Sequence, residues 1–213
     1  MKITFKKIAL ITILALSASW AFAGSGIFGS YIVLNINGAG NTFYDLSSAT
    51  INPDFGGANL GTFNPGAGNT LVLGGGEVDT FKNGSDNVLS GIINYRIYSG
   101  AAPLFTPLNE PFRDQNPAFG TNPGDQRWGQ GGANPFLTTN LLAGLTPGTY
   151  TFEAFASSGV DTTGGVTENA TNFANNAGAN YIATFTIVPE PVTTFLVGPA
   201  LLAGMFFIRR RRA

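Results

Sequence analysis

Apolar and polar residues alternate in short runs between residues 24 and 187, and turns rich in Asn, Gly and Pro separate the runs. The clearest run covers residues 88–98, where Ile93, Tyr95 and Ile97 occupy every second position. A period of two sends successive side chains to opposite faces of a strand, so one face can be buried. The pattern predicts β-strands at residues 27–36, 42–46, 70–73, 77–82, 88–98, 151–156 and 181–188.

These strands predict an all-β domain over residues 24–187, built as an Ig-like or jelly-roll-like antiparallel β-sandwich. The region holds about 165 residues, which is enough for one domain with a hydrophobic core. We expect residues 77–82 and 88–98 to pair as a hairpin around the turn at 83–86. Residues 101–135 hold six prolines and irregularly spaced aromatic residues, which predicts one long loop packed over the edge of the sandwich.

The segment Leu145-Thr-Pro-Gly-Thr-Tyr150 precedes the predicted strand at residues 151–156. It resembles the tyrosine corner of Greek-key sandwiches such as fibronectin type III domains. The resemblance implies that the Tyr150 hydroxyl bonds to backbone a few residues upstream. It also implies that this bond holds a crossing of the chain from one sheet to the other.

Residues 1–23 have the composition of a secretory signal peptide. Lys2, Lys6 and Lys7 precede the apolar stretch at residues 8–16, and Ala21-Phe22-Ala23 is a cleavage site with small residues at Ala21 and Ala23. We therefore expect a signal helix, export through the secretion translocon and cleavage after Ala23. The alternative interpretation is an uncleaved N-terminal anchor.

The C-terminal tail combines three features in a fixed order. A proline-containing linker at residues 188–191 is followed by the uncharged apolar stretch 192–208 and then by the basic cluster 209–212. The apolar stretch predicts a transmembrane helix of about 25 Å, near the lower limit for crossing a bilayer. The cluster predicts that its end stays on the cytoplasmic side of the inner membrane. The proposed signal residues are Val188, Pro189, Glu190, Pro191, Arg209, Arg210, Arg211 and Arg212.

This tail resembles the PEP-CTERM sorting signal of bacterial surface proteins. The resemblance covers residues 188–213 and implies that a membrane protease of the exosortase type cleaves near the Pro-Glu-Pro sequence. It also implies transient anchoring in the cytoplasmic membrane, then release to the cell surface or the extracellular matrix, with links to exopolysaccharide and biofilm formation. The alternative is a plain C-terminal membrane anchor.

Composition excludes several kinds of chemistry. The chain has neither cysteine nor histidine, so Ser-His-Asp triads, thiol nucleophiles and the usual zinc sites cannot form. Between residues 24 and 188 four basic residues face eleven acidic ones, a net charge of −7. This charge disfavours nucleic acid and anionic polysaccharide as direct partners. We expect a protein without catalytic activity.

Calcium is the one metal for which the sequence offers ligands, and no other cofactor is expected. Asp79, Asn83 and Asp86 would place hard oxygen atoms around one turn, and Asp161 with Glu168 would do so elsewhere. Neither set has the spacing of an EF-hand loop. The alternative is that these are ordinary solvated turn residues.

Carbohydrate binding is the second candidate chemistry. Aromatic rings stack on sugar rings, and Trp128 and Tyr98 are candidates, with Arg127 as a hydrogen-bond donor to sugar hydroxyls. In the alternative interpretation, Trp128 is the interior plug of the segment 101–135. The sequence thus predicts a secreted structural or adhesive protein of an exopolysaccharide-rich envelope. A carbohydrate-binding accessory module, or a plain membrane-anchored surface protein, is the alternative.

Overall fold

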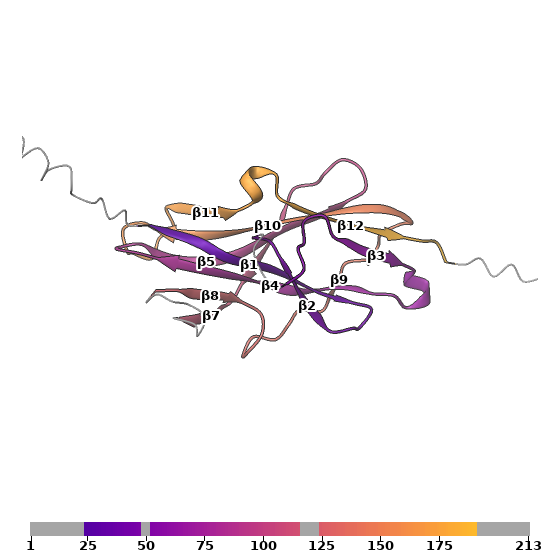
Figure 1. The fold of residues 1–213 in the computed structure, drawn as a ribbon, viewed down its shortest axis with the longest axis horizontal. Helices are drawn as coiled ribbons and strands as arrows, with labels where there is room; N and C mark the ends of the chain where they lie inside the picture. Colours follow the sequence, from indigo (N-terminus) through magenta and orange to yellow (C-terminus); the bar gives the residue numbers. More distant parts are fainter. Residues whose placement is uncertain (1–23, 48–51, 116–123, 191–213) are drawn as a thin grey trace, which may run out of the picture.

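A computed structural model describes residues 24–47, 52–115 and 124–190 of the chain. In these residues the protein is all-β, with two sheets arranged like a sandwich (Figure 1). Among the described residues no helix is long and apolar enough to cross a membrane. The predicted signal peptide, including Ala21 and Ala23, lies outside the described residues. So do Pro191, the apolar stretch 192–208 and the arginines Arg209, Arg210, Arg211 and Arg212.

The first sheet has the strand order β2-β1-β4-β8-β7, and β9 pairs with β4 beside β8. All of its pairings are antiparallel. Its central strand, β4, pairs with β1 along nearly its whole length. The strands are β1 (Ser25–Ile36), β2 (Asn41–Asp45), β4 (Leu71–Lys82), β7 (Phe112–Gln115), β8 (Gln126–Gly129) and β9 (Thr139–Asn140).

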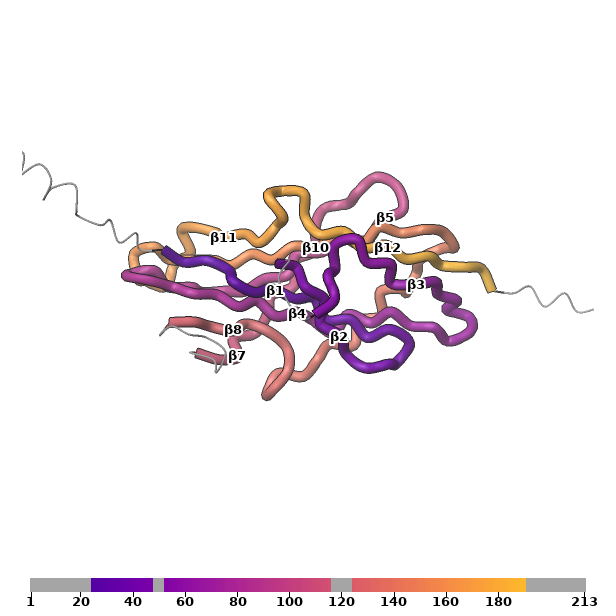
Figure 2. Tube along the Cα trace, in the orientation of Figure 1, coloured from indigo at the N-terminus to yellow at the C-terminus, as the bar shows by residue number. Residues whose placement is uncertain are grey.

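The second sheet has the order β3-β12-β10-β5-β6, and its long strand β10 organises it. One edge of β10 pairs with β12 and then with β11, while the other edge pairs with β5 (Figure 2). Only β3 with β12 is a parallel pairing. The strands are β3 (Asn59–Phe63), β5 (Asn87–Tyr98), β6 (Thr106–Glu110), β10 (Gly148–Asp161), β11 (Ala170–Ala174) and β12 (Tyr181–Ile187), and two short 3₁₀ turns are η1 (Pro65–Ala67) and η2 (Asn176–Gly178).

The hydrophobic core lies between the two sheets. Ile32 of β1, Ile93 of β5 and Phe152 of β10 are fully buried in it. The ring of Phe55 meets the ring of Phe152 edge to face, with centroids 5.1 Å apart. Burying an aromatic or branched aliphatic side chain contributes about 1.5–3 kcal/mol, so this shared core holds the sheets together. The inward positions of β5 are those that the alternation in the sequence predicts.

The expected hairpin at residues 77–98 is wrong. The two segments are successive strands, β4 and β5, but β4 belongs to the first sheet and β5 to the second. The turn at residues 83–86 therefore carries the chain from one sheet to the other. The physical reason is that β4 pairs with β1 and β5 pairs with β10 over most of their lengths, which satisfies the backbone groups of both strands.

The long loop expected at residues 101–135 is also wrong, because this segment contributes three strands. β6 adds to the edge of the second sheet, while β8 and β7 extend the first sheet beyond β4. These strands are short and polar, so they show little alternation. β6 and β7 are edge strands with a partner on one side only, whereas β8 lies between β4 and β7; backbone pairing with neighbouring strands holds all three.

The expected tyrosine corner is confirmed. The Tyr150 hydroxyl donates to the Thr146 carbonyl at 2.8 Å, and the Thr146 amide donates to the same hydroxyl oxygen at 3.1 Å. The Tyr150 ring stacks on Phe185 with centroids 5.4 Å apart. This corner lies between β9 in the first sheet and β10 in the second, where the chain crosses between sheets.

Replacing Tyr150 with Phe tests the corner. The variant keeps the ring stacked on Phe185 but leaves the Thr146 carbonyl and amide without the hydroxyl partner. We expect the free energy of unfolding to fall by about 1–3 kcal/mol, measured by urea denaturation. The control is Thr146→Val, which retains both backbone groups and should cost clearly less. Equal midpoints for Tyr150→Phe and the wild type would show that the hydroxyl does not stabilise the crossing.

Candidate functional site

The described part of the sorting segment begins where the second sheet ends. The Val188 amide donates to the Phe63 carbonyl of β3 at 2.9 Å, which extends the β3–β12 pairing by one residue. Pro189 and Glu190 follow and are exposed. The start of β1 and the end of β12 lie at opposite ends of the long axis of the molecule (Figure 1). The linker therefore leaves the domain directly after its last pairing with the sheet.

Trp128 lies in the interior of the sandwich, not on its surface. Its side chain is 9% exposed, and its Cβ lies 2.5 Å from where a Cβ on Gly91 of β5 would be. The Phe112 ring meets the indole edge to face at 5.2 Å. The indole therefore fills the space above a glycine in the opposite sheet, as in the alternative interpretation, and presents little ring surface to a sugar.

Arg127 belongs to an ionic cluster on the outer face of the first sheet. Its Nε lies 3.3 Å from Asp79 Oδ1 and 3.4 Å from Glu77 Oε1. Arg113 of β7 donates to Glu77 Oε2 at 2.9 Å. Both carboxylates are buried, so the arginines offset the cost of removing their charge from water. The cluster joins β4, β7 and β8, which makes Arg127 part of the scaffold.

The three calcium candidates do not converge on one point. Asp79 is in the middle of β4, bonded to Arg127, whereas Asn83 and Asp86 are in the turn after β4. Four residues along a strand separate Asp79 from Asn83 by about 13 Å. Within residues 24–47, 52–115 and 124–190, no group of three carboxylates could hold a metal ion.

Asp161, the other calcium candidate, organises the loop between β10 and β11. Its carboxylate accepts bonds from the Thr163 hydroxyl and amide, at 2.6 and 2.8 Å, and from the Thr167 amide at 2.9 Å. These bonds hold the pKa of Asp161 down at about 2. The carboxylate oxygen atoms of Asp161 are therefore used in hydrogen bonds within its own loop.

Two buried carboxyl groups have strongly raised pKa values: Asp79 in the ionic cluster, and Glu110 of β6 outside it. Burial raises the pKa of Asp79 to about 7, the Glu77 charge adds to the rise, and Arg127 opposes it. Burial also raises the pKa of Glu110 to about 8, against hydrogen bonds from the Gln130 side chain and the Gly76 backbone. Burial therefore shifts both carboxyl groups toward their neutral forms relative to water, although Asp79 keeps its ion pair with Arg127.

The pH dependence of stability follows from these shifts. The stabilising contribution of neutral Glu110 is complete below its ordinary value of 4.5 and is lost as the pH rises through about 8. We expect the wild-type free energy of unfolding to fall by at least about 2 kcal/mol from about pH 5 to about pH 9. Glu110→Gln should flatten this slope in urea denaturation, while the exposed control Glu168→Gln should keep it. A Glu110→Gln profile parallel to that of the wild type would contradict the assignment.

A pocket of about 420 Å³ opens at the side of the second sheet. It lies between Asp45 with residues 54–57, which precede β3, and residues 176–182 at the turn that leads into β12. Its volume falls within the usual range of small-molecule sites, about 300–1,000 Å³. The lining residues are Asp45, Asp54, Gly56, Gly57, Asn176, Ala179, Asn180, Tyr181 and Ile182.

Backbone contacts hold the two walls of the pocket together. The Gly57 amide donates to the Ile182 carbonyl at 2.7 Å, and the Phe55 amide donates to the Asp45 carbonyl at 3.0 Å. The Tyr181 ring packs against Gly56, where an added Cβ would lie 3.6 Å from the ring. The pocket is thus formed by paired backbone on one wall and by a docked aromatic ring on the other.

The second wall is a tight turn with unusual backbone angles. Asn176, Ala177 and Asn180 have φ values of 50°, 54° and 56°, in the left-handed region that few residues except glycine adopt readily. Asn is the non-glycine residue that tolerates this region best. The turn therefore holds two asparagine side chains in a defined conformation beside the cavity.

A buried carboxylate on β10 fixes this wall to the sheet. Glu153 accepts from Asn180 Nδ2 at 2.6 Å, from Arg96 Nε at 2.8 Å and from the Tyr98 hydroxyl at 3.1 Å. Burial alone would raise the pKa of Glu153, but these hydrogen bonds outweigh it and lower the pKa. Tyr98, a predicted sugar contact, therefore supports the pocket wall through Glu153 and is not among the lining residues. It does not share a surface with Trp128.

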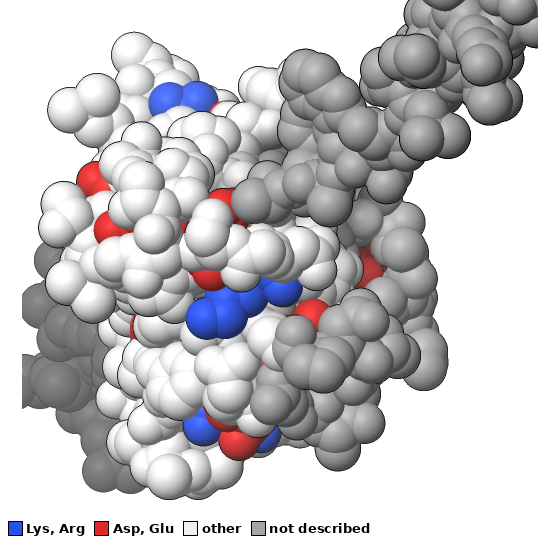
Figure 3. Space-filling view, turned by 90° about the vertical axis from the view of Figure 1, so that its left-hand side faces the viewer, with Lys and Arg blue, Asp and Glu red and all other residues white. Residues whose placement is uncertain are grey.

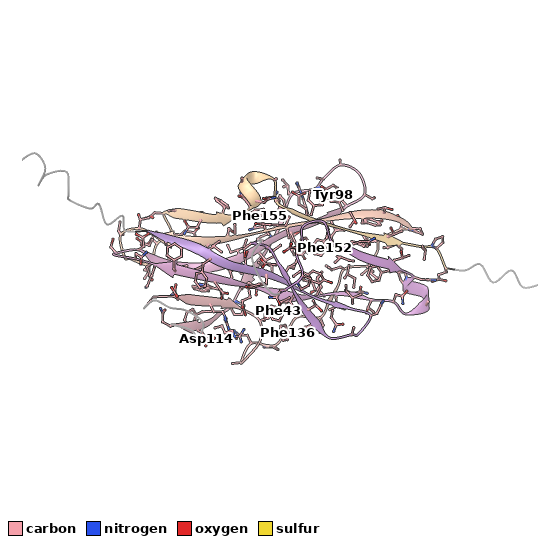
Figure 4. All side chains as sticks on the ribbon, in the orientation of Figure 1. Phe43, Tyr98, Asp114, Phe136, Phe152 and Phe155 are labelled. Atoms are coloured by element: carbon pink, nitrogen blue, oxygen red, sulfur yellow. The ribbon has the colours of Figure 1, made fainter. Side chains whose placement is uncertain are left out.

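The outer faces of the two sheets present different side chains. Tyr98 and Phe155 lie on the outer side of the second sheet, whereas Phe43, Phe136 and Asp114 lie on the opposite side of the molecule (Figure 4). The Arg96 guanidinium covers the Phe105 ring at 4.1 Å from its centroid. The Phe105 ring is therefore already in contact with Arg96, which reduces the ring surface left for a ligand.

The charges around the molecule are sparse. On the end that faces the viewer in Figure 3, Lys and Arg atoms are few and lie near Asp or Glu atoms. The pocket itself has two carboxylates, Asp45 and Asp54, and neither Lys nor Arg lines it. This arrangement suits hydroxyl groups or cations and repels anions.

The sequence-based predictions missed this pocket. Its carboxylates follow a short strand near residue 45, and its amides and ring come from residues 176–181. The one local signal is the Asn-rich stretch that ends at Asn180, directly before the last predicted strand. Turn chemistry explains that stretch equally well.

A scan against models of protein families gave no match for the chain, and a search among curated proteins gave none either. What the protein does must therefore be inferred from its own residues and their geometry.

Proposed function

We propose that this protein is an exported surface or extracellular-matrix protein with a structural or adhesive role in an exopolysaccharide-rich envelope. A signal peptide at residues 1–23 directs it to the translocon, and a membrane protease of the exosortase type cleaves its PEP-CTERM-like tail. The protein is anchored in the cytoplasmic membrane until this cleavage. It then passes to the cell surface or the matrix.

The geometry at the end of β12 is the observation that carries this proposal. The last backbone bond to the sheet is made by Val188, and the next two residues are exposed. Prolines disfavour further pairing, because Pro189 lacks an amide donor. A protease acting beyond Val188 would meet an accessible linker and would leave every strand of the domain in place.

A role without catalysis is supported by the composition and by the way the acids are used. The chain has no histidine or cysteine. Glu77, Asp79 and Glu153 are bonded to arginines, and Asp161 to the backbone of its own loop. Carboxylates held in this way are poorly placed to transfer protons to a substrate.

We also propose an Ig-like arrangement of the sandwich in preference to a jelly-roll-like one. The tyrosine corner at Tyr150 supports it, because this feature accompanies the crossing between sheets in Ig-like sandwiches. A carbohydrate-binding accessory module remains the second candidate function. The pocket beside Tyr181 favours that candidate, since it has both hydrogen-bonding groups and an aromatic ring.

Mass spectrometry of the protein recovered from the producing cells tests the processing. We expect the mature chain to begin at Gly24 and to end near residues 189–191, because Pro189 and Glu190 are exposed. Glu190→Gln should leave most of the chain uncleaved at the C-terminus. The matched control, Glu168→Gln, changes an exposed acid far from the tail and should be processed normally. Recovery of the intact chain, or equal processing of both variants, would reject the proposed sorting signal.

A further inference from the structure

We propose that the pocket between Asp45 with residues 54–57 and residues 176–182 binds a sugar unit of an uncharged polysaccharide. This inference rests on the proposed function, since it names the partner that an envelope protein would meet outside the cell. It moves the sugar contact away from two predicted residues, because Trp128 is buried in the interior and Arg127 is bonded to carboxylates in the ionic cluster.

The polar groups of the pocket match sugar hydroxyls. Asp54 is exposed at the pocket, and its carboxylate accepts hydrogen bonds. Asn176 and Asn180 bring amides that both donate and accept. Asn180 uses one Nδ2 hydrogen for Glu153, and its amide also carries a second N–H and an acceptor oxygen. Sugar hydroxyls also donate and accept, and hydrogen bonds to a charged carboxylate are the stronger kind.

The apolar groups of the pocket match the carbon-bound faces of a sugar ring. Tyr181 packs one side of its ring over Gly56, and Ile182 is 42% exposed beside it. Both residues begin β12, so the apolar wall stands on a paired strand. An aromatic ring next to a few oriented polar groups is the usual composition of a small-molecule site.

The charge of the pocket selects among polysaccharides. Asp45 and Asp54 both line the cavity, and neither Lys nor Arg is among the described residues that line it. A uronic acid or a sulfated sugar would place its own anion against these carboxylates and bind weakly. The ligand class is therefore a neutral, hydroxyl-rich glycan.

The pocket is organised before any ligand arrives. Glu153 holds Asn180 at 2.6 Å, and Glu153 is in turn held by Arg96 and Tyr98 from β5. The left-handed backbone at Asn176 and Asn180 sets the direction of both amides. Groups that are already ordered lose less conformational entropy on binding, which favours measurable affinity for a small ligand.

Isothermal titration of the purified full chain tests this inference. The probes are maltohexaose, mannohexaose and galactohexaose as neutral glycans, trigalacturonic acid as an anionic one, and calcium chloride alone. We expect at least one neutral hexasaccharide to bind and trigalacturonic acid not to bind. Asp54→Asn should weaken the binding by about tenfold or more, since it removes the charge from one acceptor.

Asp114→Asn is the matched control, because it changes a half-exposed carboxylate on the side of the molecule opposite Tyr98 (Figure 4). It should bind like the wild type, and both variants should melt within a few degrees of the wild type, since Asp54 is exposed and Asp114 is half-exposed. The inference is overturned if no neutral probe binds, if both variants bind equally, or if trigalacturonic acid binds as well. Calcium binding that Asp54→Asn abolishes, without any glycan binding, would identify a cation site instead.

The outcome is separable from that of the proposed function. Titration uses purified protein and does not depend on processing in the cell. A chain that binds glycan but keeps its tail contradicts only the sorting proposal, whereas a processed chain without glycan binding contradicts only this inference.

Discussion

The burial of one face of each sheet against the other is the constraint on which the structure depends. The central strands β4 and β10 each have partners on both edges, so their backbone groups are satisfied within the sheets. Their inward side chains, such as Val78 and Phe152, are then free to form a common core. Every functional feature lies outside this core, on outer faces or in connections. The core therefore makes the domain rigid, and the loops carry the residues that could contact a partner.

Electrostatics follows from the same arrangement. Arg96, Arg113 and Arg127 each pair with a buried carboxylate of a central strand, Glu153 on β10 or Glu77 and Asp79 on β4. Removing one partner from such a pair leaves an uncompensated charge, which is costly. The arginines thus serve the scaffold, and most of the remaining acids lie in turns. The domain is therefore acidic overall, and the charges that Figure 3 shows form no continuous basic patch.

The pocket and the tail use two ends of one strand. β12 begins with Tyr181 and Ile182 at the pocket and ends at Ile187, directly before the linker. Pairing with β10 on one edge and β3 on the other holds this strand in place. A glycan in the pocket and a membrane at the tail would therefore be joined by one short, doubly paired element. This connection lasts until the proposed cleavage beyond Val188 separates the domain from the membrane.

The amino-acid sequence alone determined which residues of β5 and β12 turn inward, the bond made by Tyr150, and the absence of histidine and cysteine chemistry. These features are local. The alternation of buried and exposed side chains and the residue types of a turn can be read from positions that lie close together in the sequence. Only the tertiary structure decided that β4 and β5 belong to different sheets, that β6, β7 and β8 extend the two sheets, and that Asp54 and Tyr181 line one pocket. Backbone pairing between strands depends little on which side chains they carry. Contacts between distant segments produce no repeating pattern in a single sequence.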